Sequence, residues 1–235
     1  MKFWIVVPAA GIGSRVGASC PKQYLPLCGK TIIEHSLERL LSVSPERVVV
    51  SLHPEDRHWQ GLDIRNHALI SVVTGGAERV HSVRNALSFL ADRANNQDWV
   101  LVHDVARPCV RAADIKRLLK ALQASSVGGI LAAPVSDTLK QVKGSEIQTT
   151  LDRSVLWAAL TPQMFRFGLL RDAIDRALAE GVIPTDEAMA VERLGHRPMV
   201  VTGSRDNIKV TLREDIAIAE AILRWQAGES EESEE

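Results

Sequence analysis

Two positively charged side chains belong to a loop of small residues near the N-terminus. The loop spans residues 8–22 (PAAGIGSRVGASCPK) and follows the apolar run 3–7 (FWIVV), which is typical of a buried strand. Small residues let backbone N–H groups approach a ligand closely, and Arg15 and Lys22 add two positive charges. Amides give directional bonds and cations neutralise charge, so the combination suits phosphate oxygens. The loop therefore predicts binding of a polyphosphate.

The loop does not match two common phosphate-binding patterns. A Walker A loop needs a lysine directly after its last glycine, but Ala18 follows Gly17 here. A dinucleotide-binding fingerprint needs its third glycine where Val16 stands, and its ribose-binding acid should close the next strand. The acids at that distance, Glu34 and Glu38, fall in a helical pattern. A plain tight turn is the remaining alternative to a phosphate site of another kind.

Strand and helix patterns alternate along most of the chain. Predicted strands cover residues 3–7, 47–52, 68–73, 99–102, 129–133 and 199–202, and predicted helices cover residues 31–41, 80–90, 113–122, 168–180, 185–194 and 214–226. This alternation predicts an α/β fold with a Rossmann-like, mostly parallel twisted sheet and helices on both faces. We find no linker or repeat in the sequence and expect residues 1–227 to form one domain.

Two segments fall outside this pattern. Residues 135–156 are polar and β-branched around a turn at residues 143–145 (KGS), and they predict a protruding β-hairpin arm. An isolated hairpin is marginal in water, so the arm is expected to pack either on a second subunit or on its own domain. Residues 228–235 (GESEESEE) are expected to form a disordered acidic tail.

Composition narrows the class of protein. The 235 residues are 46% apolar and 24% charged, with a net charge of −1. The last eight residues hold five of the acids, so the rest is mildly basic, which suits small anions rather than nucleic acid. No apolar run reaches the length of a membrane span, and the N-terminus lacks a signal-peptide layout. Three cysteines without a C-x-x-C pair predict a reduced cytoplasmic protein with neither disulfides nor a zinc site.

Polar clusters follow several predicted strands, and ligands of parallel α/β sheets bind beyond the carboxyl ends of strands. Residues 74–79 (TGGAER) with Ser82 suit a base or a sugar, although a plain turn with Ser82 as a helix cap is equally consistent. Asp104, after the strand 99–102, is placed for Mg²⁺, which takes one or two carboxylates plus phosphate oxygens. An ion pair with Arg107 is the alternative.

Further polar residues suit a second anion. Beyond the strand 199–202, Asp206 offers a second metal contact and Lys209 a phosphate contact, while Thr211 and Glu214 predict a capping box for the last helix. The chain shows no Ser-His-Asp order, nucleophile elbow or HExxH motif, so covalent catalysis is not indicated. The hairpin and the segments after it add hydroxyls and an arginine for a second anionic substrate: Thr138, Arg153, Thr161 and Thr185.

Eight segments carry a resemblance to a known family. In chain order they are PAAGIGSRVG…PKQYLPLCGKTIIEHSL, GGAERVHSV, VLVHDVARPCV, APVSDTLK, TLDRSVLW, LTPQMF, TDEA and DNIKVT, within residues 3–224. With them the chain resembles the 2-C-methyl-D-erythritol 4-phosphate cytidylyltransferases of the non-mevalonate isoprenoid pathway. The resemblance implies transfer of a cytidylyl group from CTP to methylerythritol phosphate, release of pyrophosphate, and Mg²⁺ or another divalent cation as cofactor.

The resemblance also implies roles for individual residues. Arg15 and Lys22 match residues that stabilise the transition state, and Arg153 and Lys209 match residues that position the attacking phosphate. The hairpin matches an arm that is exchanged in a homodimer, so Thr138 and Arg153 would serve the site of the neighbouring subunit. The attacking oxygen is already anionic, so this reaction needs positioning and charge neutralisation rather than a strong base.

Metal and nucleotide positions follow from the same matches. Asp104 and Asp206 match metal-side positions, and Gly76 and Ser82 match the cytosine pocket. The other predicted substrate-binding residues are Pro8, Ala9, Ala10, Gly11, Gly13, Ala106, Arg107, Thr161 and Thr185.

One residue departs from the family pattern. His81 stands where the family usually has an acid, which affects any contact made through that side chain but not those through Ser82. Two alternative functions remain. One is a sister cytidylyltransferase acting on ribitol 5-phosphate, and the other is a nucleotide-binding module without turnover, which would need no site for a second anion.

Overall fold

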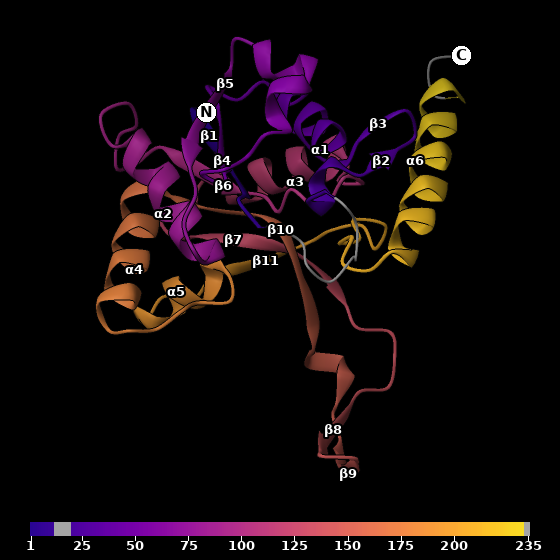
Figure 1. The fold of residues 1–235 in the computed structure, drawn as a ribbon. Coiled ribbons are helices and arrows are strands. Elements are labelled where there is room, and N and C mark those ends of the chain that lie inside the picture. The colour runs from indigo at the N-terminus through magenta and orange to yellow at the C-terminus, as the bar shows by residue number, and fades with distance from the viewer. Residues whose placement is uncertain (12–19, 233–235) are drawn as a thin grey trace.

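The centre of the molecule is a seven-stranded sheet with the strand order β11-β7-β10-β6-β1-β4-β5 (Figure 1). The computed structural model describes residues 1–11 and 20–232. Neighbouring strands are parallel except at β10, which runs antiparallel to both β6 and β7, so the predicted mostly parallel α/β sheet is confirmed. The strands are β1 (Phe3–Ala9), β4 (Val48–Leu52), β5 (Ile70–Thr74), β6 (Trp99–Val102), β7 (Gly128–Pro134), β10 (Trp157–Arg166) and β11 (Met199–Thr202).

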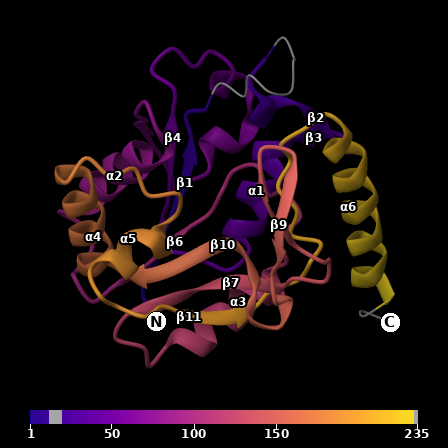
Figure 2. The same ribbon diagram turned by 90° about the horizontal axis from the view of Figure 1, so that it is seen from below.

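Helices cover both faces of the sheet, as the alternating pattern predicted (Figures 1 and 2). One face is covered by α1 (Ile32–Leu41) and α3 (Ala112–Leu122). The other face is covered by α2 (Arg79–Leu90), α4 (Phe167–Ala179) and α5 (Glu187–Arg193).

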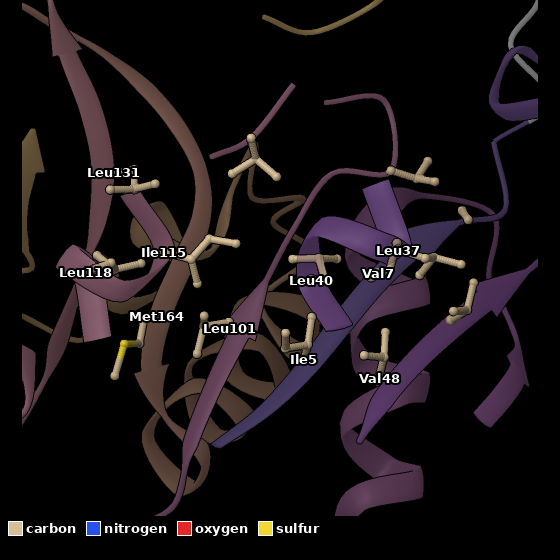
Figure 3. Close-up of a cluster of buried hydrophobic side chains, with 14 of the residues drawn as sticks. Ile5, Val7, Leu37, Leu40, Val48, Leu101, Ile115, Leu118, Leu131 and Met164 are labelled. Atoms are coloured by element: carbon tan, nitrogen blue, oxygen red, sulfur yellow. The ribbon is translucent and has the colours of Figure 1, made fainter. Parts of the chain in front are cut away.

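The side chains of β1 alternate between two buried layers. Ile5 and Val7 belong to the layer beneath α1 and α3, part of which is shown in Figure 3. Trp4 and Val6 belong to the opposite layer, beneath α2, α4 and α5. A strand buried on both faces is apolar at every position rather than at every second one, which is why residues 3–7 form a continuous apolar run.

One strand of the central sheet, β10, was not predicted from the sequence, because it contains Pro162. Proline lacks an N–H donor and is rarely found in a central strand. Here the pairing of β10 with β7 shifts its register between Ala159 and Gln163, so the ladder is interrupted where the proline stands. Regular pairing resumes at Gln163, which lies opposite Val102 of β6.

The predicted hairpin arm is present between β7 and β10. Its strands are β8 (Lys140–Lys143) and β9 (Glu146–Thr150), which pair with each other in a separate two-stranded sheet. Figure 1 shows the arm projecting away from the domain. Every residue of both strands is exposed, so packing of the hairpin on its own domain, one of the two alternatives, is excluded.

The closing helix α6 (Glu214–Glu232) lies beside the small sheet of β2 (Pro26–Leu27) and β3 (Lys30–Thr31). Its last five residues, 228–232, belong to the segment that was predicted to be a disordered tail, so that boundary is wrong. Acidic residues give no apolar periodicity from which to predict a helix. One of them is tied to the domain, because Glu229 pairs with Arg111 at 2.8 Å.

The start of α6 also differs from prediction. The backbone N–H groups of Thr211 and Leu212 donate to Oδ2 of Asp215 at 2.7 and 2.8 Å. The Thr211 hydroxyl donates to the same oxygen at 3.0 Å. The predicted capping box of Thr211 and Glu214 is therefore replaced by a carboxylate one position later.

Short 3-10 helices complete the chain: η2 (Lys22–Tyr24), η3 (Trp59–Gly61), η4 (Asp63–Asn66) and η5 (Arg153–Val155). Within residues 1–11 and 20–232, no helix combines the length and the apolar character needed to cross a membrane. The three cysteines are free thiols.

Candidate active site

A cavity of about 470 Å³ lies beyond the carboxyl ends of β1, β5, β6 and β11. This is the edge at which ligands of parallel α/β sheets bind. The residues predicted from sequence that line this cavity are Pro8, Ala9, Ala10, Gly11, Lys22, Gly76, Ser82, Asp104, Ala106 and Lys209. Segments from distant parts of the chain therefore meet around one space.

The turn after β5 packs closely against Ala10 and α2 because it contains two glycines. A Cβ on Gly75 would lie 2.3 Å from the Cβ of Ala10, and a Cβ on Gly76 would lie 2.3 Å from the Cβ of His81. The Gly76 N–H donates to the Ser82 hydroxyl at 3.1 Å. Ser82 lies inside α2 and does not cap it, so the alternative of a plain helix cap is wrong.

His81 helps to cap the start of α2. Glu78 is the N-cap residue, and its backbone N–H donates to Nδ1 of His81 at 3.2 Å. The imidazole thus takes the place of the acid that normally closes a capping box. The departure from the family pattern at this position preserves the helix start.

Lys22 is the last residue of the loop of residues 8–22, and its side chain is held by a contact with a distant segment. Its ammonium group donates to the carbonyl of Val210 at 3.1 Å, across 188 residues of chain. The neighbouring Gln23 is buried and donates to the carbonyl of Ala9 at 2.9 Å, which fixes this turn to the end of β1. Gly13 and Arg15 lie outside the residues that the structure describes.

The carboxylate of Asp104 is the centre of a cluster of cations. Its Oδ1 lies 2.8 Å from Nε of Arg79, and its Oδ2 lies 2.8 Å from Nζ of Lys209. Arg107 stands farther away, at 3.9 Å from Oδ2, so the ion pair weighed against a metal role is the weakest of the three. The side chain of Asp104 is 10% exposed, and this residue lines the cavity.

These charges fix the protonation states at the site. Burial alone would raise the pKa of Asp104, but the positive charges of Arg79 and Lys209 outweigh it and hold that pKa well below its usual range. Burial alone would lower the pKa of Arg79, but Glu187 and Asp104 outweigh it and raise that pKa. Both groups are therefore ionised throughout the physiological range.

A buried histidine and a threonine hold the backbone of Asp104. The hydroxyl of Thr161 accepts the Asp104 N–H at 3.1 Å and lies 3.1 Å from Nδ1 of His103. The other nitrogen of His103, Nε2, lies 3.1 Å from the carbonyl of Arg107, which accepts only, so Nε2 carries the proton and the Thr161 hydroxyl donates to Nδ1. Burial lowers the pKa of His103 to about 4, which keeps the ring neutral.

Three predicted substrate-binding residues are not part of the described wall of the cavity. Thr161 is buried, and its hydroxyl contacts the Asp104 N–H and the His103 ring. Arg107 donates to the carbonyl of Asn207 at 2.7 Å and connects the loop after β6 to the loop after β11. Thr185 stands two residues before α5, and its N–H lies 3.4 Å from the sulfur of Met189.

Asp206 does not join Asp104 in the described wall of the cavity. Its Oδ2 accepts from Nε of Arg111 at 2.7 Å and from Nε2 of Gln226 at 3.0 Å. These contacts attach the loop after β11 to α3 and α6. The fold therefore does not bring Asp206, the predicted second metal ligand, together with Asp104.

Two more predicted residues, Thr138 and Arg153, lie on the arm. Both are exposed, and the guanidinium of Arg153 donates to the carbonyl of Ser136 within the arm itself. The described wall of the cavity contains neither of them.

Sequence reasoning missed the arginine that organises the site. Arg79 was noted only as part of the TGGAER segment, yet it bonds Asp104 with Nε and Glu187 with Nη1 and Nη2. Glu187 is 108 residues away in the chain, so no spacing rule predicts the pair. The available signals were an arginine at the start of the helix that follows the predicted strand 68–73 and an acid near the start of the predicted helix 185–194.

Comparisons with known proteins agree with the geometry. A family profile described as "IspD: 2-C-methyl-D-erythritol 4-phosphate cytidylyltransferase" matches residues 3–225. The chain is similar to proteins of that name from Vibrio vulnificus strain YJ016 (51% identity over 220 residues, 93% of each chain) and Hahella chejuensis (46% over 225 residues, 95% of this chain and 93% of that one).

Solved structures show the same likeness. The crystal structure of the Francisella tularensis 2-C-methyl-D-erythritol 4-phosphate cytidylyltransferase matches with a TM-score of 0.83 at 37% identity, over 94% of this chain and all of that one. The Thermus thermophilus enzyme of the same name matches with a TM-score of 0.77 at 32% identity, over 95% of this chain and all of that one. The chain belongs to the 2-C-methyl-D-erythritol 4-phosphate cytidylyltransferase (IspD) family.

Proposed function

We propose that this protein transfers the cytidylyl group of CTP to 2-C-methyl-D-erythritol 4-phosphate, giving 4-diphosphocytidyl-2-C-methyl-D-erythritol and pyrophosphate. An oxygen of the acceptor phosphate attacks the α-phosphorus of CTP, and the bond from that phosphorus to the bridging oxygen of pyrophosphate breaks. Family membership supports this reaction. The observation that carries it is the placement of Lys22 and Lys209 on one cavity with Asp104.

The charges of the cavity suit a reaction between two anions. Lys22, beside the opening loop, would neutralise charge at the triphosphate, and Lys209 would hold the incoming phosphate. The attacking group is already ionised, so no general base is required, and the neutral, buried His103 supports the backbone rather than a proton transfer. Catalysis would come from alignment and electrostatic stabilisation of the transition state.

The nucleotide would enter along the backbone of the two glycine-containing loops. Pro8 to Gly11 and Gly76 face the cavity, and the close approach at Gly75 and Gly76 leaves no room for side chains there. Backbone donors and the Ser82 region would then select cytosine, as the family resemblance implies. Ala106 adds a small side chain to the same wall.

The residues present fit a magnesium ion held mainly by substrate. Within the described residues, no group of three or more His, Cys, Asp or Glu side chains is arranged as a metal site. Mg²⁺ commonly uses one or two carboxylates together with phosphate oxygens, and Asp104 is an ionised carboxylate on the cavity. When bound, the cation would neutralise charge on the phosphates. We assign Asp104 to it and leave Asp206 as a weaker candidate.

A second subunit would complete the site. The arm carries exposed apolar residues, including Val142, Ile147 and Val155, which a partner chain could cover. The exposed Thr138 and Arg153 have no place in the described cavity of their own chain, so we propose that they act in the neighbouring subunit of a homodimer. Thr161, Thr185 and Arg107 stay predicted substrate-binding residues. A cytoplasmic location stays a prediction.

Pyrophosphate release tests the proposal. The purified protein is given CTP and Mg²⁺ with either 2-C-methyl-D-erythritol 4-phosphate or ribitol 5-phosphate. We expect rapid release with the first acceptor and slow release with the second. A preference for ribitol 5-phosphate would assign the sister activity, and binding of CTP without release with either acceptor would point to a nucleotide-binding module.

A further inference from the structure

A continuous line of opposite charges runs from α5 into the cavity. Oε1 and Oε2 of Glu187 lie 2.6 and 2.9 Å from Nη1 and Nη2 of Arg79. Nε of the same arginine lies 2.8 Å from Asp104, whose other oxygen lies 2.8 Å from Lys209. The sequence of charges is negative, positive, negative, positive. The cavity holds the last three members, and Glu187 stands behind them.

Glu187 is the least exposed member of this line. Its side chain is 2% exposed, whereas those of Arg79 and Lys209 are 27% and 40% exposed. A carboxylate is costly to bury unless a cation is paired with it through several hydrogen bonds, and the two-pronged contact with Arg79 meets that condition. Both carboxylate oxygens of Glu187 therefore have partners without any contact to a substrate.

The fold fixes Glu187 through β10. Nε2 of Gln163 donates to Asp186, and the Ala188 N–H donates to Oε1 of Gln163, both at 2.9 Å. The side chain of one buried glutamine thus holds the residues on either side of Glu187. Two positions earlier on the same strand, Thr161 holds the backbone of Asp104. One strand therefore sets the relative position of both acids.

Arg79 stands between two acids that compete for it. If Glu187 lost its charge, the guanidinium would keep only Asp104 as a charged partner. That carboxylate would then be bound more tightly to Arg79, and the cavity would carry one more uncompensated positive charge. Both effects oppose the approach of a divalent cation to Asp104, because like charges repel and the opening is only partly screened by solvent.

We propose that Glu187 is a positioning residue that acts through Arg79 and keeps the carboxylate of Asp104 available to a metal-bound nucleotide. It is not a catalytic residue, because it lies behind the cavity wall. The inference rests on the proposed role of Asp104 at the metal. It adds a requirement for a negative charge at position 187, which no motif in the loop of residues 8–22 indicates.

The test uses the full chain with the Mn²⁺ complex of CTP as probe. Binding is followed by the change in water-proton relaxation rate, which requires no turnover. Glu187→Gln removes the charge and keeps the size, whereas Glu187→Asp keeps the charge and shortens the reach. Glu180→Gln is the matched control, since it removes an exposed glutamate that pairs with Arg193 at 2.5 Å.

We expect Glu187→Gln to weaken binding of Mn²⁺·CTP by about tenfold or more, the loss usual for a group that supports a metal ligand. Glu187→Asp should lose less, and Glu180→Gln should bind like the original chain. The proposal is overturned if Glu187→Gln binds normally while Asp104→Asn does not. It is also overturned if Glu187→Gln and Glu187→Asp lose binding equally, in step with equal losses of thermal stability.

A different result would refute the metal role of Asp104, on which the proposal for Glu187 depends. If Asp104→Asn binds Mn²⁺·CTP as tightly as the original chain, Asp104 has no role at the metal, and both the metal assignment and the role of Glu187 fail. Pyrophosphate release by that variant would show whether the proposed reaction survives without them.

Discussion

The wall around Asp104 and the hairpin arm carry the two parts of one proposed site, and they are built in opposite ways. Asp104 is held by contacts that its own chain supplies: the ion pairs with Arg79 and Lys209 and the backbone bond to Thr161. Arg153, on the arm, is exposed, and the hairpin strands near it pair with each other rather than with the central sheet. The first region is complete once the chain has folded, whereas the apolar residues of the second stay exposed. We propose that another chain buries them.

This difference separates two kinds of effect. Substitutions around Asp104 should change chemistry or the stability of the monomer. Substitutions on the hairpin should change association and activity while leaving the monomer's fold intact. The following predictions test that separation.

The largest effect is expected from Lys22→Ala. Removal of one preorganised charge at a developing anionic centre commonly costs about 10²–10³ in turnover. The fold should persist, because the Lys22 side chain is only half-buried and lines the cavity. Steady-state pyrophosphate release measures the loss, with Lys30→Ala as control for an exposed lysine paired with Glu38. A near-normal rate for Lys22→Ala would contradict the assignment.

The next effect concerns acid stability. The pKa of His103 is about 4 in the folded protein, below the ordinary value of 6.5, so the unfolded chain binds the additional proton between these values. Stability is therefore fully present above pH 6.5 and is lost as the pH falls toward 4. Between pH 7 and pH 5 we expect a loss of about 2 kcal/mol from this group.

Urea unfolding at the two pH values measures this loss. His103→Gln lacks the titrating ring, so its free energy of unfolding should fall less between pH 7 and pH 5, even though it starts lower. An equal fall in both proteins would show that His103 does not remain neutral in the folded state.

A smaller effect on association is expected from the hairpin. Val142 and Ile147 lie opposite each other in the hairpin, with exposed fractions of 57% and 63%. Replacing both with serine should weaken dimerisation by at least about tenfold, since each buried aliphatic side chain contributes about 1.5–3 kcal/mol. Sedimentation equilibrium measures the association. The free energy of unfolding of the monomer should stay within about 0.5 kcal/mol; a larger fall would contradict the separation, because it would show that these side chains stabilise the fold of their own chain.

The smallest effect is expected at the start of α6. Asp215 accepts two backbone N–H groups and a hydroxyl, so Asp215→Ala should cost about 1 kcal/mol, as loss of a helix cap does. Glu214→Ala, at the position that the sequence predicted for this contact, should be neutral. The free energies of unfolding of the two variants test the two contacts directly. A larger loss at position 214 than at position 215 would support the predicted capping box instead.

Much of the fold could be predicted because buried parallel strands and amphipathic helices leave strong local patterns. The strands at 99–102 and 199–202 have the predicted bounds. β10 could not be predicted, because Pro162 argues against a central strand and only the neighbouring strands show how the register shift accommodates it. The end of α6 was also misplaced, because acidic residues give no apolar periodicity.

The site was predictable where its residues lie in the loops that follow predicted strands. Lys22, Gly76, Asp104 and Lys209 all line the cavity, as expected from their places in the chain. The contacts of Arg79 with Glu187 were not predictable, because they join segments 108 residues apart. The sequence shows which residues carry charge, but which of them form ion pairs with one another is determined by the three-dimensional fold.

The most direct test of the account is a mixed dimer of Lys22→Ala and Arg153→Ala subunits, purified through a different tag on each chain. If the arm serves the neighbouring subunit, one site of each mixed dimer combines an intact Lys22 with an intact Arg153, and the other site lacks both. We then expect about half of the activity of the original dimer, whereas each variant alone is nearly inactive. If the arm instead serves its own chain, both sites of the mixed dimer are defective, and an inactive mixed dimer would contradict the account.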